Sequence, residues 1–521
     1  MLFQVGSLNT AALTAPGEYV QIVPPTTKYI NGVPTNILGL VGVASWGPVG
    51  APVLIGSPQD QSMYLGDPVV RASDLSTAVS AALQLGQANI RTVRVSDGTD
   101  AAATVAVMDV NSTPAIGLTL NAIYTGTVGN KITASVAAGS KASSYKLLLS
   151  RPGYLSEVFD NITGTGAALW AAMVSAVNNG NSAARGPSQL CIATAGVGTA
   201  LPNIVSSYTL AGGTDGVATI TGASLVGVDT GTRKGMYALR GTGVQVATLV
   251  DHTDSTAWGT IASFGAQEGI FIGVQAASGN SYSATSTLLT TAGADSAWLK
   301  VCIGDWVVWN DPVNTVQRLL GPATFWAALR ASLAPYQSTL NKPVLPIIGT
   351  TRSINNQIYS QAELGAAASA RLDYLANPSA GGSYFGFQTD RNASSDTNTN
   401  SEAYTTMTNY LALTLAASFG YVIGKPQTDD LRRTVQNSIQ SFLLNLWKPG
   451  SGPQYIGDPN DSKAVPYSVQ INAQNNPSSQ VALGYMSAYV KVKYLSIVRY
   501  FIVSLEGGAS VNVTVSATAP F

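Results

Sequence analysis

Short apolar runs alternate with one helical pattern in the first hundred residues. The runs are bounded by turn residues and predict strands: 37–44, 52–55 and 92–95. Residues 73–86 repeat apolar side chains every three or four positions, which predicts a helix with Ser73 as its N-cap. Strand, helix and strand in this order indicate an α/β layer over residues 36–100.

A second alternation of strand and helix follows later in the chain. Residues 245–250 predict a strand, residues 255–268 a helix, and residues 270–275 another strand. This order is typical of a parallel βαβ unit. The sequence therefore predicts a second α/β domain over residues 212–350.

The segment between these two patterns has a different composition and shorter apolar runs. Residues 101–211 are short runs of Thr, Val, Ala and Gly separated by turns, with one helical stretch at 167–178. A glycine cluster at 210–216 closes the segment and favours positive φ angles. These features predict an inserted β-rich domain.

The last third, residues 351–506, is the most regular part of the chain. Residues 404–415 place apolar side chains on one helical stripe, and residues 428–447 predict an amphipathic helix capped by Thr428. Three residues on the polar face of that second helix must meet polar surroundings: Arg432, Arg433 and Gln436. Two strands are then predicted, at 467–471 and 485–505.

Both ends of the chain carry β-forming segments. In the N-terminal arm, residues 1–35, the segment is Tyr19, Val20, Gln21, Ile22 and Val23. In the C-terminal arm, residues 507–521, apolar and polar residues alternate over Val511, Asn512, Val513, Thr514 and Val515, after the hinge residues Gly507 and Gly508. Two interpretations stay open: a hairpin within the chain, or donation of each strand to the sheet of a neighbouring subunit.

Charge changes the picture. The 521 residues include 27 basic and 27 acidic side chains, so the net charge is zero with the single histidine neutral. This balance argues against nucleic-acid binding, and the lack of an apolar run of 18 residues argues against membrane insertion. Charged residues make up 10% of the chain, against about 25% in soluble globular proteins. Such a surface tends to self-associate, which favours a subunit of an assembly.

Little catalytic chemistry is visible. His252 is the single histidine, and without a nucleophile motif beside it we favour a solvated residue at a strand end. Cys191 and Cys302 lie in apolar runs and predict buried free thiols rather than a disulfide. Trp306 and Trp309 could stack on a ligand, but aromatic packing is favoured. No metal-ligand spacing or P-loop is present, so we predict no enzyme activity, metal or cofactor.

Several motifs follow one another in an ordered series. The opening ones are Pro16-Gly-Glu-Tyr-Val20, Ile30-Asn-Gly-Val-Pro-Thr35 and Leu40-Val-Gly-Val-Ala-Ser-Trp-Gly-Pro48. The most specific one is Gly304-Asp-Trp-Val-Val-Trp-Asn-Asp-Pro312, and the helix at 430–447 comes last. In this order they resemble the contractile tail sheath proteins of bacteriophages, relatives of which sheath R-type pyocins and type VI secretion systems.

The resemblance implies a fold and a function. The fold would be α/β and α+β multidomain: an inner C-terminal α/β domain whose sheets neighbouring subunits complete, a second α/β domain, and an inserted β-rich outer domain. The chain would polymerise around a tail tube by strand exchange. It would then contract from an extended metastable state to a compact one and drive the tube through the host envelope. We expect it in the virion tail, after assembly in the bacterial cytoplasm.

The resemblance also implies partners and sites. The partners would be further copies in a helical polymer of hexameric rings, the tail tube protein, and baseplate and tail terminator proteins. The strands that accept the arms would carry Val469, Ile471, Val490, Val492, Ile497 and Val503, and the polar residues of the last helix, named above, would contact the tube. The alternatives are a tube or baseplate component, or a hydrolase that uses His252.

Overall fold

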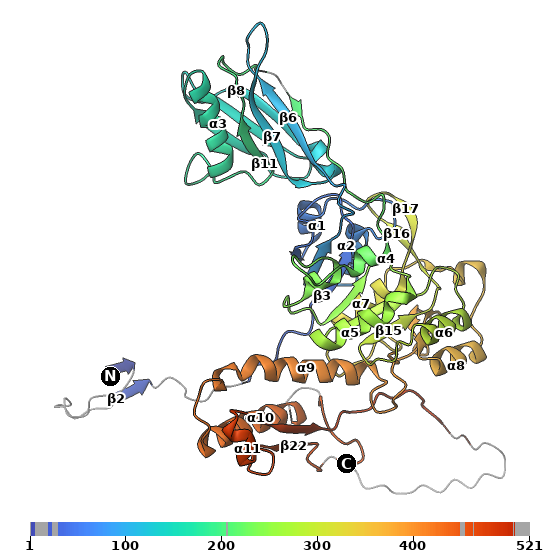
Figure 1. Ribbon diagram of the computed structural model, residues 1–521. Coiled ribbons are helices and arrows are strands. Elements are labelled where there is room, and N and C mark those ends of the chain that lie inside the picture. The colour runs from blue at the N-terminus through green and yellow to red at the C-terminus, as the bar shows by residue number, and fades with distance from the viewer. Residues whose placement is uncertain are drawn as a thin grey trace.

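The structure is a computed structural model that describes residues 2–5, 19–22, 30–204, 207–448, 454–461, 463–503 and 505. Figure 1 shows three parts stacked along one axis: a β-rich top lobe, a central sheet with its helices, and a lower part of helices and a small sheet. After the N-terminal strands, the described chain enters the central part, leaves it for the top lobe, returns, and continues into the lower part. The architecture is mixed α/β with several sheets, as predicted.

A seven-stranded sheet forms the centre of the molecule. In spatial order its strands are β19 (Leu372–Asp373), β15 (Leu299–Cys302), β14 (Phe271–Gln275), β13 (Val246–Leu249), β3 (Leu38–Gly42), β5 (Ile90–Arg94) and β4 (Pro52–Ile55). All neighbours are parallel except the edge pair β4 and β5. The four middle strands β15, β14, β13 and β3 are buried along their whole length, as in a sheet covered on both faces.

This sheet corrects one prediction. The sequence predicts separate α/β units over residues 36–100 and 212–350, but their strands share one sheet, with Leu38 of β3 paired to both Ile90 and Val246. A hydrophobic pattern identifies a strand but not its neighbour, and the long insertion between β5 and β13 hides their common sheet. The predicted βαβ unit itself is confirmed, since β13 and β14 are parallel neighbours joined by α5 (Trp258–Glu268).

Helices cover both faces of the sheet. On one face α2 (Leu75–Gln84) packs against α7 (Pro322–Ser332), and α5, α6 (Tyr282–Thr291) and α8 (Gln361–Ser369) cover the other. The cap of α2 differs from the prediction: the Asp74 carboxylate accepts from the Thr77 N–H at 2.9 Å, whereas Ser73 has a φ of 55°. The shorter elements of the central part are α1 (Pro58–Tyr64), α4 (Gly222–Val226), β16 (Val307–Asp311), β17 (Val316–Leu320), β18 (Gly349–Thr350), β20 (Leu375–Ala376) and β21 (Gly386–Phe387).

Most of the chain between β5 and β13 folds into the top lobe, and α4 lies where it has returned to the central part. One sheet contains β10 (Glu157–Ile162), β9 (Tyr145–Ser150), β8 (Thr133–Ala138) and β12 (Tyr208–Thr209); the other contains β11 (Cys191–Ala195), β7 (Ile116–Thr125) and β6 (Ala102–Met108). The predicted helix is α3 (Ala167–Asn179), which buries Trp170 and Met173 in the core of the lobe. The lobe is β-rich as predicted for residues 101–211, and the domain boundaries stay a prediction.

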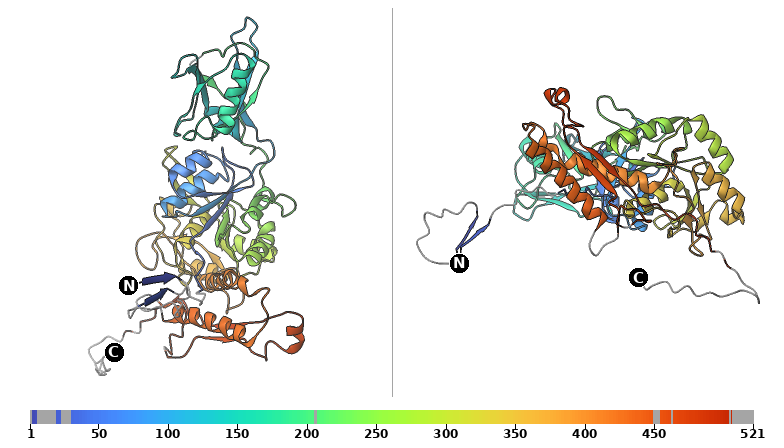
Figure 2. Two further views of the ribbon diagram at one scale, coloured as in Figure 1. Left: turned by 90° about the vertical axis from the view of Figure 1, so that its left-hand side faces the viewer. Right: turned by 90° about the horizontal axis from the view of Figure 1, so that it is seen from below.

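Two long helices, one short helix and a small sheet form the lower part, which Figure 2 shows from the side and from below. The helices α9 (Glu402–Ser418) and α10 (Asp429–Trp447) lie where the sequence predicts them, and Thr428 caps α10. After them come β22 (Tyr467–Gln470), α11 (Ser478–Ala482) and β23 (Tyr489–Val492). The strand predicted over 485–505 is wrong outside β23. Past β23, Tyr494 forms an isolated bridge with Ile456, and the described chain supplies no strand that pairs with the apolar residues that follow.

Candidate assembly surface

β22 and β23 form a small antiparallel sheet in the lower part. The register pairs Val469 with Val490 and Tyr467 with Val492. Behind the sheet, the Gln436 amide of α10 donates to the Val469 carbonyl at 3.2 Å. Within the described ranges, each of these two strands pairs with no strand except the other. A two-stranded sheet is marginally stable alone, and its edges can pair with strands of another chain.

Four of the six predicted acceptor residues lie at this sheet. Val469, Val490 and Val492 are in its strands, and Ile471 follows β22 directly. Ile497 and Val503 lie outside any strand, and Val503 is 68% exposed. The prediction is wrong for these two residues because the apolar pattern does not show where β23 ends.

The N-terminal arm contains a ribbon of two strands. β2 (Tyr19–Ile22) holds four of the five predicted residues, and Val23 lies outside the described residues. It pairs in parallel with β1 (Leu2–Val5), which the sequence pattern does not predict because the apolar run is so short. Figure 1 and the view from below in Figure 2 show this ribbon away from the three stacked parts. The predicted C-terminal arm, 511–515, and its hinge, 507–508, also lie outside the described residues.

The three predicted tube-contact residues do not share one exposed face of α10. Arg433 is exposed, but Arg432 is half-buried and lies 3.5 Å from the Asp429 carboxylate. Gln436 points to β22, as described above. The helical pattern separates apolar from polar positions, but it does not show that a polar side chain contacts the chain's own sheet. Arg433 is therefore the one residue of the three that stays a candidate for contact with another protein.

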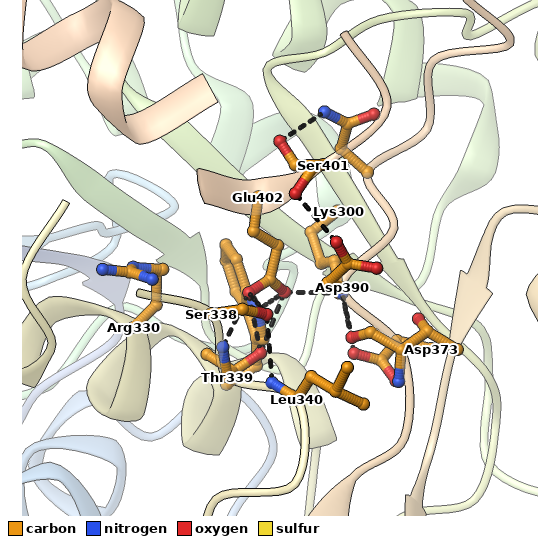
Figure 3. A network of polar contacts seen from close by, with 12 residues as sticks. Lys300, Arg330, Ser338, Thr339, Leu340, Asp373, Asp390, Ser401 and Glu402 are labelled. Atoms are coloured by element: carbon orange, nitrogen blue, oxygen red, sulfur yellow. Dashed lines mark hydrogen bonds and ion pairs between the residues drawn. The ribbon is translucent and has the colours of Figure 1, made fainter. Parts of the chain in front are cut away.

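A buried ionic network attaches α9 to the central sheet (Figure 3). Lys300 Nζ on β15 lies 2.7 Å from Asp373 Oδ2 on β19 and 2.6 Å from Glu402 Oε1 in the first turn of α9, and all three side chains are fully buried. Burial alone would lower the pKa of Lys300, but the charges of Asp373 and Glu402 outweigh it and raise that pKa above its ordinary value. Lys300 is therefore held as an ammonium group.

Glu402 is also held from the side of α7. It accepts hydrogen bonds from Trp326 Nε1 at 2.8 Å and from the Thr339 N–H at 3.0 Å. Arg330 of α7 is buried beside it and donates to the carbonyls of Leu333 and Ala334. The network fixes α9 against two elements of the central part at once. Sequence reasoning missed it, although a single Lys inside the apolar run 298–303 is a signal of a buried, paired charge.

His252 corrects a further expectation, because it is buried instead of solvated. Its side chain is 2% exposed and lies against Gly222, where an added Cβ would come within 2.9 Å of Nε2. In the described part of the chain neither ring nitrogen has a hydrogen-bond partner, so no serine or cysteine is paired with it. Burial lowers the pKa of His252, which keeps the ring neutral. A hydrolase that uses this residue has no geometric support.

The other chemical candidates are packing residues. Trp309 is buried and donates from Nε1 to Gln84 Oε1 at 2.8 Å, in agreement with the aromatic-packing interpretation. Cys191 and Cys302 are buried free thiols, as predicted. Over the residues that the structure describes, no cluster of His, Cys, Asp or Glu could hold a metal ion. None of the described helices has the length and apolar character needed to cross a membrane.

Comparison with known proteins finds likeness in structure and none in sequence. No family model matches the chain, and no curated protein matches it. A sheath tail protein from Listeria innocua aligns with a TM-score of 0.60 at 16% identity, over 90% of this chain and 96% of its own. A sheath tail protein from Desulfitobacterium hafniense aligns with a TM-score of 0.56 at 16% identity, over 87% and 93%.

A third similar structure is an assembled sheath. A chain of the PVC sheath complex, an extracellular contractile injection system in its contracted state, aligns with a TM-score of 0.55 at 10% identity, over 96% of this chain and 99% of its own. The alignments span the top lobe, the central sheet and the lower part together. The chain therefore has the fold of contractile tail sheath proteins, which confirms the resemblance indicated by its motifs.

Proposed function

We propose that the chain is a structural, non-enzymatic subunit of a contractile tail sheath. The single observation that carries the proposal is the fold match, which extends over nine tenths or more of both chains for the Listeria protein and the PVC sheath chain. The low content of charged residues supports it, because much of the surface of such a subunit is covered in the polymer. Its expected location is the tail of a virion or of a related injection particle.

Assembly would proceed by strand exchange between copies of the chain. The sheet of β22 and β23 offers edges with no partner strand in the described residues, and the N-terminal ribbon lies away from the body. A donated strand of about five residues adds roughly four to six hydrogen bonds of ~1 kcal/mol net each. One such contact is weak, but the same contact repeated around a helical polymer is strong.

Contraction would be a rigid-body rearrangement of subunits whose arms stay connected. The energy would come from the difference between an extended and a compact polymer, since the sequence has no P-loop to bind a nucleotide. Partners of the proposed sheath are the tail tube, for which Arg433 is an exposed candidate contact, and the baseplate and terminator proteins at its two ends.

Electron microscopy of the purified protein tests the proposal. The full chain should form wide hollow sleeves, and a variant that lacks residues 509–521 should stay a folded monomer with an unchanged melting temperature. Narrow stacked rings would instead indicate a tube component. Sleeves formed by the truncated variant would contradict strand donation by the C-terminal arm.

A matched pair of substitutions refines this test. In the alternating sequence pattern, Val513 belongs to the apolar face and Thr514 to the opposite face. The two variants are Val513→Asp and Thr514→Asp. The first should weaken assembly more than the second, with no change in monomer melting. Equal assembly by both variants would show that the alternation has no part in it.

A further inference from the structure

The chain after β23 is fixed to the body at several points. Tyr494 OH lies 3.1 Å from Thr408 Oγ1, and Tyr404 OH lies 3.1 Å from Ser496 Oγ. Residues 494–499 therefore follow the surface of α9 toward the central part. We refer to residues 494–503 as the arm root, because they lead to the predicted C-terminal arm.

The last of these attachments is a bidentate ion pair. Arg499 Nε lies 2.6 Å from Asp390 Oδ1, and Arg499 Nη2 lies 2.9 Å from Asp390 Oδ2. Two parallel hydrogen bonds of this kind fix the orientation of the guanidinium as well as its position. Beyond Arg499 the chain turns out of the body: Tyr500, Phe501, Ile502 and Val503 are 68–87% exposed.

Asp390 is itself part of a buried polar chain that reaches the central sheet (Figure 3). It is 1% exposed, accepts from Ser401 Oγ at 2.8 Å, and its carbonyl accepts from the Glu402 N–H at 2.8 Å. Glu402 in turn contacts Lys300 of β15. A continuous series of hydrogen bonds and ion pairs therefore joins the arm root to the central sheet.

We propose that the Arg499–Asp390 pair is a clamp that sets where the C-terminal arm leaves the subunit, and that residues 500–503 beyond it pack against a second copy of this chain. The inference rests on the proposed sheath function and deepens it. A second copy is the occupant because four successive large side chains are exposed at the base of a segment predicted to cross to a neighbour. The clamp would transmit force on the arm into the central sheet instead of into the marginal sheet of β22 and β23.

Hydrogen exchange on the free subunit tests the clamp without any assembly. Arg499→Gln removes the bidentate pair at a partly exposed position, so the fold should stay intact. Amide exchange in residues 497–503 should become about tenfold faster, with no change in the central sheet. Arg185→Gln is the matched control. The side chains of Arg185 and Glu157 are 29% and 2% exposed, and those of Arg499 and Asp390 are 28% and 2% exposed, but Arg185 and Glu157 lie in the top lobe. Unchanged exchange at 497–503 in Arg499→Gln would overturn the clamp.

Sleeve formation tests the second half of the inference. Phe501→Asn changes a side chain that is 87% exposed, so monomer melting should not change, while the concentration needed for assembly should rise about tenfold or more. Assembly at the wild-type concentration would show that residues 500–503 do not pack against a second copy. If the wild-type chain itself forms no sleeves, the proposed function fails, but the exchange result still decides the clamp.

Discussion

Individual buried charges decide how the parts of this molecule are joined. β15 is an apolar strand except for Lys300, and that one ammonium group contacts carboxylates from β19 and α9. A buried charge without its partners would cost several kcal/mol, so the three elements must come together in one arrangement. The network thus specifies geometry more than it adds net stability.

Replacing Lys300 by Met should lower the free energy of unfolding by about 3–5 kcal/mol, because Asp373 and Glu402 would stay buried without their cation. Urea unfolding of the purified protein measures this change. Lys131→Met, at an exposed position of the top lobe, is the control and should stay within about 0.5 kcal/mol of wild type. A loss below about 1 kcal/mol for Lys300→Met would contradict the role of the network.

The buried neutral His252 predicts a pH dependence. Its pKa is lowered by burial, whereas in the unfolded chain it has the ordinary value of 6.5. Below pH 6.5 the unfolded state therefore binds a proton that the folded state excludes, and stability falls as the pH falls. The contribution of His252 to the free energy of unfolding is therefore fully present above pH 6.5. Below that pH a single group can lower the free energy of unfolding by at most about 1.4 kcal/mol per pH unit.

His252→Gln removes this titration, so comparison with wild type isolates it. As the pH falls from 7.5 to 5.5, the free energy of unfolding should decrease more for the wild type than for His252→Gln. Urea unfolding at a series of pH values measures the difference. A difference that does not vary with pH would show that His252 can be protonated in the folded protein.

At the scale of elements, the helices of the lower part can be predicted from their own sequence more completely than its strands. α10 packs Val435, Ile439 and Phe442 on one face, and that face is visible in its sequence. β22 and β23 are four residues each. Their hydrogen bonds depend on a partner strand, and the sequence pattern of a strand does not show which strand pairs with it. A sheet of two short strands gains stability when further strands join it, which is why the arms matter to the proposed polymer.

At the scale of the whole molecule, the top lobe is attached through two adjacent chain crossings. The Thr214 N–H donates to the Ala101 carbonyl at 3.1 Å, and the Asp97 N–H donates to the Gly216 carbonyl at 2.8 Å. Trp46 of the central part packs into the core of the lobe, so the two parts also share apolar contacts. The central sheet, however, contains no strand from the lobe.

Replacing residues 102–213 with two glycines should therefore leave the central sheet folded. We expect one cooperative thermal transition at a reduced melting temperature, because Trp46 loses its apolar contacts with the core of the lobe and becomes exposed. Calorimetry and resistance to proteolysis measure this. Replacing residues 246–275 with the same linker is the control, and it should abolish folding because it removes β13 and β14. Loss of the transition in the first variant would show that the lobe is required for the sheet.

Local sequence determined the helices α2, α3, α5, α9 and α10, the parallel βαβ unit, the β-rich insertion and the resemblance to sheath proteins. Each depends on residues close together in the chain, such as the apolar face of α10 or the alternation of β13, α5 and β14. Tertiary structure alone decided that β3 lies between β5 and β13, that His252 is buried, that Gln436 faces β22, and that Asp390 holds Arg499. The physical reason is that these features join segments tens to hundreds of residues apart. A pattern records the burial that a residue needs but not which distant residue supplies it.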